Sequence, residues 1–199
     1  MPIPAQVTPH EGLTRLNALP RQAAEQALRT CCASHAWARR LAAHRPYPDL
    51  DALLAAADEA SYDLAPADIT EALARESLPL PPVAAVYSAA HTALGAAHAA
   101  YQDRFGHTFV VCLDETAPDE ALDHLLSALR DRLGNDREEE RVVAADELRR
   151  LARGRIVRLV RNFPNLLDLP ERPNIPAALR TGPGAAHREG VGNSPYVPV

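Results

Sequence analysis

The chain has 199 residues, which suits one domain with room for a tail, and it carries a formal net charge of −5. This mildly acidic balance argues against non-specific binding to nucleic acid or to an anionic membrane. Hydrophobic residues make up 47% of the chain, much of it alanine, whereas aromatic residues make up only 5%. Because alanine favours helices and aromatic residues favour strands, the composition predicts an all-α protein.

The sequence contains no apolar stretch of about 18 residues, the length that indicates a transmembrane helix. Its N-terminus lacks the basic region and apolar core of a signal peptide, so we expect a cytoplasmic protein. The cysteines Cys31, Cys32 and Cys112 are odd in number and two are adjacent, so we expect neither a disulfide framework nor a C-x-x-C metal site.

Prolines and the spacing of apolar residues divide the chain into about eight predicted helices. In chain order they span residues 12–19, a stretch opening at Pro20, a stretch after Ser34, 49–60, 66–74, 83–104, 118–133 and 136–161. Pro66 suits a first helical turn, and Ser34 and Asp136 are expected N-caps. Gly106 is expected to end the sixth helix in a left-handed cap.

The same pattern predicts the domain organisation. Residues 1–11 form a flexible lead-in, residues 12–163 an all-helical domain, and residues 164–199 a disordered tail rich in Pro and Gly. Residues 76–82 form a loop, because their three prolines cannot lie within one helix. The apolar run FVVCL at 109–113 could be extended, but no second strand is available to pair with it.

The sixth predicted helix carries three polar residues on one face, namely Ser88, His91 and Thr92. They could face a small polar ligand, or they could form the solvated stripe of an amphipathic helix, which is the commoner case. His98 lies two turns beyond His91, roughly 10.5 Å away, whereas zinc binds its ligands at about 2.1 Å. We therefore expect no metal site from this pair.

Two charged residues and one thiol elsewhere are candidates for chemistry. Glu76 follows the fifth helix, where a carboxylate could act in acid–base chemistry or could simply be a charge at a helix end. Arg155 lies near the apolar face of the last helix, where its planar fork could clamp a carboxylate or could offset the helix dipole. Cys112 lies in an apolar run and is expected to be inert. These residues indicate a helical protein that could bind a small anion.

Six segments of the chain, in order and with consistent spacing, carry a family resemblance. They are LNALP at 16–20, CCASHAWA at 31–38, RPYPDLDALLAAAD at 45–58, YQDRFGHTFVVC at 101–112, RLGNDREEE at 132–140 and ELRRLARGRI at 147–156. Over residues 12–161 the chain resembles the 2-oxo-4-hydroxy-4-carboxy-5-ureidoimidazoline (OHCU) decarboxylases. The resemblance implies an all-helical, cofactor-free decarboxylase of the uric-acid pathway that forms (S)-allantoin from a small anionic substrate. It also allows a homodimer, because family members are often dimers.

The resemblance also assigns roles to residues. Substrate-binding positions fall on Ser88, Thr92, Arg155 and the main chain of one run, whose members are Phe109, Val110, Val111, Cys112 and Leu113. The family's H-P-R-I-G motif carries the catalytic acid–base His, and Glu76 stands at that position. The family's S-x-x-E-Q motif aligns with residues 88–92, where His91 replaces Glu and Thr92 replaces Gln. The catalytic His and Glu are thus exchanged in this chain.

This exchange has two interpretations. In the first, a swapped pair is catalytic: His91 is the acid–base group, and Glu76 orients it and stabilises its cation. In the second, the pocket has changed substrate or lost catalysis, because catalytic geometry tolerates displacements of only about 0.5 Å. Three function classes remain open: a ureide-pathway decarboxylase, a lyase or tautomerase of a related small acid, and a non-catalytic binding or interaction protein. A pocket joining Glu76, Ser88, His91 and Arg155 would favour the two enzymes.

Overall fold

The computed structural model describes residues 9–78 and 89–167, without the side chains of residues 9, 89–91 and 164–167. Within these residues the chain forms eight helices and no strand, which confirms the all-α prediction. The helices are α1 (Pro9–Ala18), α2 (Arg21–Arg29), α3 (His35–Ala43), α4 (Leu50–Tyr62), α5 (Pro66–Leu73), α6 (Ala89–Phe105), α7 (Ala121–Arg132) and α8 (Arg137–Leu167). None of these helices is long and apolar enough to cross a membrane.

Local capping chemistry explains where several helices begin and end. The Ser34 side chain accepts a hydrogen bond from the Trp37 amide at 3.3 Å and begins α3. Asp136 accepts from the Glu138 amide at 2.8 Å and begins α8. Gly106 ends α6 with a φ of +81°, which side chains disfavour. These contacts confirm the predicted caps.

Helix α8 extends further than expected, through Pro164 to Leu167 rather than ending near residue 161. Proline has no amide hydrogen, so the Val160 carbonyl lacks its usual partner four residues on. Burial offsets this loss, because Val160 and Phe163 belong to the core. Helix α1 packs on this part of α8 and begins at Pro9, three residues before its expected start. The predicted tail beyond Leu167, the first eight residues of the lead-in and the expected start of the sixth helix at residue 83 lie outside the described residues.

Two segments of the N-terminal half, 16–20 and 45–58, are held together by hydrogen bonds from side chains of one segment to main-chain groups of the other. The Asn17 side chain donates to the Tyr47 carbonyl at 2.8 Å and accepts from the Tyr47 amide at 3.0 Å. The Arg45 guanidinium donates to the carbonyls of Leu16 at 2.6 Å and Leu19 at 2.9 Å, which lie at the end of α1. Arg45 therefore satisfies acceptors that the end of a helix leaves without partners.

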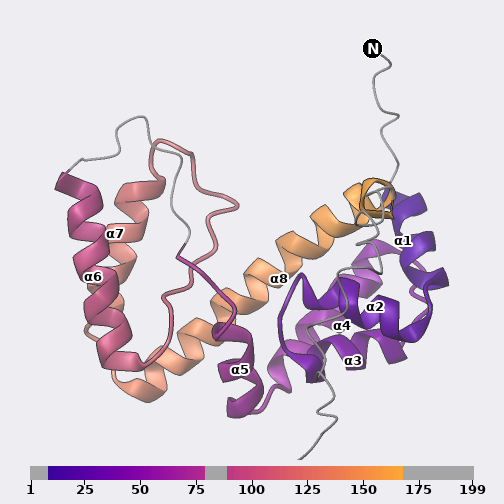
Figure 1. Ribbon diagram of the computed structural model, residues 1–199, viewed down its shortest axis with the longest axis horizontal. Coiled ribbons are helices and arrows are strands. Elements are labelled where there is room, and N and C mark those ends of the chain that lie inside the picture. The colour runs from indigo at the N-terminus through magenta and orange to yellow at the C-terminus, as the bar shows by residue number, and fades with distance from the viewer. Residues whose placement is uncertain (1–8, 79–88, 168–199) are drawn as a thin grey trace, which may run out of the picture. The chain divides into compact units, whose positions relative to one another are not determined.

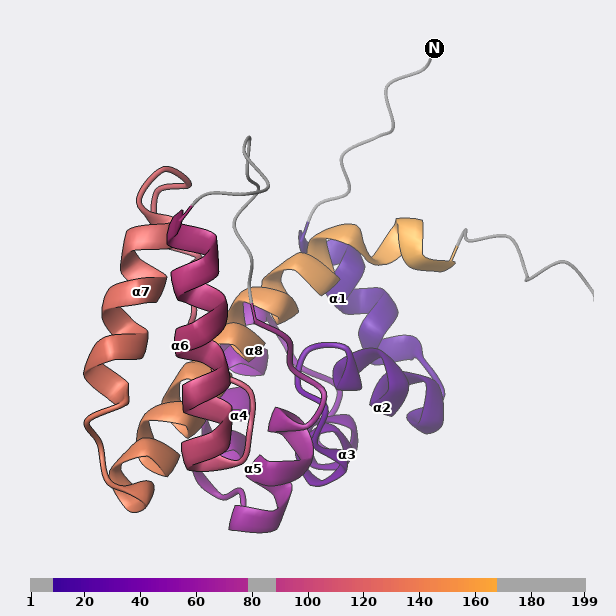
Figure 2. The ribbon, with the colours of Figure 1, turned by 60° about the vertical axis from the view of Figure 1, so that its left-hand side comes forward.

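Apolar side chains form two cores, which α8 and the run FVVCL connect. The larger core lies among α1–α5 and α8, and the smaller lies between α6 and α7. Figures 1 and 2 show α8 passing from the α6–α7 pair to the group formed by α1–α4. Val110 is buried in the larger core, whereas Phe109 and Val111 are buried in the smaller one. This alternation is that of an extended segment, so the run joins the two cores.

A buried ion pair holds this run in place. Arg132, at the end of α7, donates from Nε to the Glu140 carboxylate of α8 at 2.9 Å, and both side chains are almost fully buried. Glu140 also accepts from the Tyr101 hydroxyl and from the Asn135 amide. Arg132 Nη1 donates to the Val110 carbonyl at 2.6 Å. Burial, together with the Glu140 carboxylate, raises the pKa of Tyr101, so its hydroxyl remains a donor.

Replacing Gly12 with alanine should destabilise the protein, because the new Cβ would overlap the carbonyl oxygen of Val160 on α8. Forcing the two helices apart should lower the free energy of unfolding by about 1–3 kcal/mol, measured by urea denaturation. Gly95→Ala on α6 is the matched control, because its Cβ meets nothing within 4 Å. That variant should gain about 0.5–1 kcal/mol from helix propensity. Equal effects of the two changes would contradict the close α1–α8 approach.

Glu140→Gln should destabilise the protein strongly, because it leaves the Arg132 guanidinium buried without its counter-charge. We expect a loss of about 3–5 kcal/mol in the free energy of unfolding. Glu138→Gln is the control: Glu138 lies in the same turn of α8 and pairs with Arg141, but its side chain is 70% exposed. The control should leave the urea midpoint nearly unchanged. A similar midpoint for the two variants would show that the buried pair contributes little.

Candidate functional site

The structure joins two of the predicted site residues in an ion pair. Glu76 follows α5, Arg155 lies on α8, and their side chains meet as parallel forks, with both Nη1–Oε1 and Nη2–Oε2 at 2.7 Å. Arg155 Nη1 also donates to the Cys31 carbonyl at 3.1 Å. The Glu76 side chain is only 7% exposed and that of Arg155 is 30% exposed. Hydrogen bonding to Glu76 raises the pKa of the Arg155 guanidinium, which stays fully charged.

The end of the Arg155 fork, predicted to hold a ligand carboxylate, is thus occupied by the chain's own Glu76. A guanidinium has five N–H groups, and the contacts with Glu76 and Cys31 use three of them. The two that remain are the Nε–H and the second N–H of Nη2, which form the side edge of the guanidinium. No described residue accepts a hydrogen bond from this side edge.

A polar cavity of about 280 Å³ lies beside this pair. Its lining residues come from the end of α2, the segment after α5, and α8: Arg29, Thr30, Ala33, Arg75, Glu76, Ser77 and Arg155. Two buried thiols flank the pair. Burial raises the pKa of Cys31 to about 12 and also raises the pKa of Cys32, so both thiols remain protonated and neutral. Glu76 is therefore the one anionic group among the described lining residues.

The remaining predicted polar residues lie on or before α6. Thr92 is an exposed residue of this helix. His91 lies in the first turn of α6, but its side chain falls outside the described part of the structure. Ser88 also lies outside the described residues. The pairing of Glu76 with His91 therefore stays a prediction, whereas the pairing of Glu76 with Arg155 is observed.

Three main-chain groups of the run FVVCL, which was expected to hold substrate, already have partners in the protein. Arg132 binds the Val110 carbonyl, and the Cys112 amide donates to the Glu147 carboxylate at 2.7 Å. The Leu113 carbonyl accepts from the Thr116 amide at 3.0 Å. The side chains of Phe109, Val110 and Val111 are buried in the cores. Any substrate contact with this run therefore falls to its other main-chain groups.

Sequence reasoning did not single out Arg132 or Glu147, the two side chains that hold the run FVVCL. Both lie in segments that carried the resemblance, RLGNDREEE and ELRRLARGRI. Each segment therefore has a charged residue, Arg132 or Glu147, at a position that matches the family pattern. Their partners, however, are main-chain atoms of residues 22 and 35 positions away, and a sequence pattern does not reveal such pairings.

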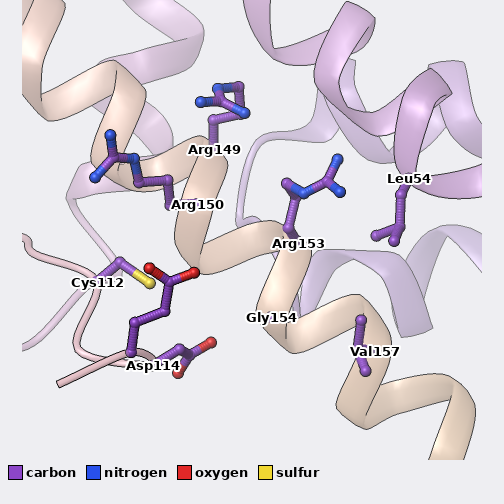
Figure 3. A pocket seen from close by; sticks show the side chains of 9 residues that line it. Leu54, Cys112, Asp114, Arg149, Arg150, Arg153, Gly154 and Val157 are labelled. Carbon is purple, nitrogen blue, oxygen red and sulfur yellow. The ribbon is translucent and has the colours of Figure 1, made fainter. Parts of the chain in front are cut away.

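Cys112 lines a second and larger cavity of about 530 Å³, between the end of the run and α8. Figure 3 shows Cys112 and Asp114 on one side of it and the arginines of α8 along another. These arginines have partners: Arg149 and Arg153 bind Asp58, and Arg150 binds Asp146. Arg158, beside the cavity, binds Asp114.

Burial raises the pKa of the Cys112 thiol, in agreement with its expected inertness. Cys112 does not line the cavity of Glu76 and Arg155.

Comparison with solved structures finds proteins of the same fold. The chain shares its fold with the crystal structure of an (S)-allantoin synthase, with a TM-score of 0.59 and 18% identity. That match covers 74% of this chain but 53% of the other, so this chain spans about half of that protein's length. The crystal structure of an OHCU decarboxylase in the presence of (S)-allantoin matches with a TM-score of 0.57 and 21% identity, over 66% of this chain and 95% of the other.

No curated protein matches the chain. The two structural likenesses, at such low identity, show a common fold. The sequence model of the OHCU decarboxylases, in contrast, matches residues 17–77 and 83–157, which is more than half of the chain and includes both Glu76 and Arg155. On this evidence the chain belongs to the OHCU decarboxylase family.

Proposed function

We propose that this protein is a cofactor-free decarboxylase of the uric-acid pathway, which converts OHCU to (S)-allantoin. The observation that carries the proposal is the half-buried Arg155, held beside a small polar cavity with one edge of its guanidinium unpartnered by any described residue. Membership of the family supports the reaction type. The fold shared with an OHCU decarboxylase solved in the presence of (S)-allantoin supports the product.

The chemistry needs few protein groups. When the substrate loses its carboxylate as carbon dioxide, the bonding electron pair forms a double bond between the ring carbons C4 and C5, and the adjacent ring C=N accepts the displaced electrons and a proton. The 4-hydroxyl group is then an enol, which becomes an enolate when it loses its proton. Because the substrate itself accepts these electrons, no cofactor is needed, and protein donors only have to stabilise the enolate oxygen. In this proposal the side edge of Arg155 holds a substrate oxygen. His91 delivers a proton to the neighbouring ring carbon C5 as the enolate oxygen becomes a carbonyl, and Ser88 and Thr92 contact the substrate.

Glu76 acquires a role in this scheme that differs from the one expected. Its carboxylate holds the Arg155 guanidinium in one orientation through two parallel hydrogen bonds, each 2.7 Å long. A carboxylate offers about four lone-pair sites, so Glu76 could accept a further bond from His91 while it binds Arg155. A fixed guanidinium lowers the entropic cost of binding an anion, because it is already oriented.

One observation favours a second candidate function, in which the protein acts on another small acid or binds a ligand without catalysis. The end of the Arg155 fork is occupied by a carboxylate that is 7% exposed. A substrate carboxylate could take this position only by leaving Glu76 buried without a partner, at a cost of several kcal/mol. A pocket shaped in this way could suit a different acid.

The proposed activity can be tested by generating OHCU in situ from urate, with urate oxidase and hydroxyisourate hydrolase, and following (S)-allantoin by circular dichroism. We expect the protein to accelerate its formation, and His91→Ala to abolish the acceleration. Arg155→Lys keeps the charge but loses the planar fork, so kcat/KM should fall about 100-fold. Arg161→Lys is the matched control, because Arg161 is an exposed residue of α8 that does not line this cavity. A folded protein that gives only the spontaneous rate would exclude the decarboxylase and leave the second candidate.

The ion pair itself can be tested by a double-mutant cycle of Glu76→Gln and Arg155→Gln. We expect each single change to leave one charge buried, so the double variant should be more stable than the sum of the two effects predicts. The coupling energy, measured by urea denaturation, should be about 1–3 kcal/mol. The exposed pair of Arg21 and Glu25 on α2 is the comparison, with a coupling of about 0.5 kcal/mol or less. A coupling near zero for Glu76 and Arg155 would mean that the fork is open to ligands in solution.

A further inference from the structure

We infer that the substrate site continues along α8 into a second cavity, in which Asn162 recognises an uncharged urea or amide arm of the ligand. This inference rests on the proposed function and deepens it, because it names the part of the substrate that a further residue selects. The second cavity, which we call the arm cavity, has a volume of about 290 Å³. It is lined by Thr30, Arg155, Arg158, Leu159 and Asn162.

The arm cavity adjoins the cavity beside Glu76, because Thr30 and Arg155 line both of them. Arg155 is held at this place by its ion pair with Glu76. Along α8, Leu159 and Asn162 follow Arg155 at intervals of four and three residues, so the three residues share one face of the helix. A ligand held at Arg155 can therefore extend along this face and reach Asn162.

The charges that line the arm cavity are already matched within the protein. Arg155 binds Glu76, and Arg158 donates to both carboxylate oxygens of Asp114 at 3.0 Å. None of the described residues that line the arm cavity carries a negative charge. A cationic arm would therefore find no counter-charge in the lining, and an anionic arm would meet arginines whose charges are already compensated. These charges favour an arm that is polar but uncharged.

The hydrogen-bonding groups of the arm cavity suit a urea or an amide. The Asn162 side chain is exposed and makes no hydrogen bond to a described residue, so its carbonyl can accept and its NH₂ group can donate. The Thr30 hydroxyl donates to the Ala27 carbonyl at 2.7 Å, and its oxygen can still accept a hydrogen bond. A urea has both N–H donors and a carbonyl acceptor, so it can pair with Asn162 and Thr30 together.

The substrate of the proposed reaction has one carboxylate and one arm of this kind. As its name states, the carboxylate is on ring atom C4 and the ureido group is on the adjacent atom C5. With the ring beside Arg155, the ureido group can enter the arm cavity while the carboxylate stays in the cavity beside Glu76. The family model matches the chain only to residue 157, so Arg158, Leu159 and Asn162 lie beyond the matched residues. The role of Asn162 is therefore inferred from the cavity of this chain and not from the family.

The compounds 3-ureidopropionate and 5-methylhexanoate test the inference directly. Each has one carboxylate and nearly the same shape, but an apolar branched end in the second replaces the urea of the first. In 3-ureidopropionate two carbon atoms separate the carboxylate from the ureido group, as in the substrate. We expect ligand-observed NMR titration of the whole protein to show 3-ureidopropionate bound about 5–10 times more tightly. Equal or weaker binding of 3-ureidopropionate would overturn the inference, and so would absence of binding by either compound to the folded protein.

The variant Asn162→Leu tests whether Asn162 holds the arm, because leucine has the same branching as asparagine but no hydrogen-bonding group. Asn162 is exposed, so the variant should fold normally. It should bind 3-ureidopropionate about 3–10 times more weakly, without weaker binding of 5-methylhexanoate. Gln22→Met is the matched control, since it removes an exposed side-chain amide of α2 that lines neither cavity, and both affinities should stay unchanged. Equal losses in the two variants, or no loss in Asn162→Leu, would overturn the role of Asn162.

These outcomes are separable from those of the decarboxylase assay. If the protein turns over OHCU, Asn162→Leu should raise KM with little change in kcat, because the arm is held equally before and during the reaction. Turnover with an unchanged KM in this variant, and no preference for 3-ureidopropionate, would keep the proposed function and remove the role of Asn162. A preference for 3-ureidopropionate that depends on Asn162, without turnover, would keep the inference and remove the decarboxylase.

Discussion

The buried ion pair of Arg132 and Glu140 is the contact on which the arrangement of this domain depends. It joins the end of α7 to the start of α8, takes up the Tyr101 hydroxyl of α6, and binds the Val110 carbonyl between the two cores. Two buried charges are costly to desolvate, and this cost is offset only when nearly every donor and acceptor has a partner. The network meets that condition through the further bond from Asn135 to Glu140. The run FVVCL is therefore held in one position relative to α8.

Helix α8 makes structural contacts along its whole length. Near its start it anchors the buried pair, at Glu147 it binds the Cys112 amide, and one face of its C-terminal half packs against α1. Arg155 lies between these regions and reaches back to Glu76. The orientation of the Arg155 guanidinium is thus determined by a helix that is held at both ends. A rigid support of this kind is what a binding site needs if a small ligand is to be recognised by geometry.

The pair of Glu76 and Arg155 is the central contact of the candidate site. A carboxylate stands at the position where the family's catalytic His is expected, and it satisfies the arginine that is expected to bind substrate. The same contact is compatible with two functions. It can orient Arg155 for decarboxylation, or it can occupy the two terminal nitrogens of Arg155 in a cavity that binds a different acid. No described residue accepts a hydrogen bond from the side edge of the guanidinium, and Arg29 and Arg75 line the same cavity.

The sequence by itself determined the helical class, most of the helix ends and the family, because apolar spacing, capping residues and matched segments are local properties. Ser34, Gly106 and Asp136 cap helices as their residue types predict. Only the tertiary structure decided that α8 continues past Pro164, since burial of Phe163 outweighs a missing hydrogen bond that local propensity would penalise. It also decided the partner of Glu76. Arg155, 79 residues away, binds the carboxylate, because pairings between distant side chains depend on how the helices pack, and the contact of Glu76 with His91 stays a prediction.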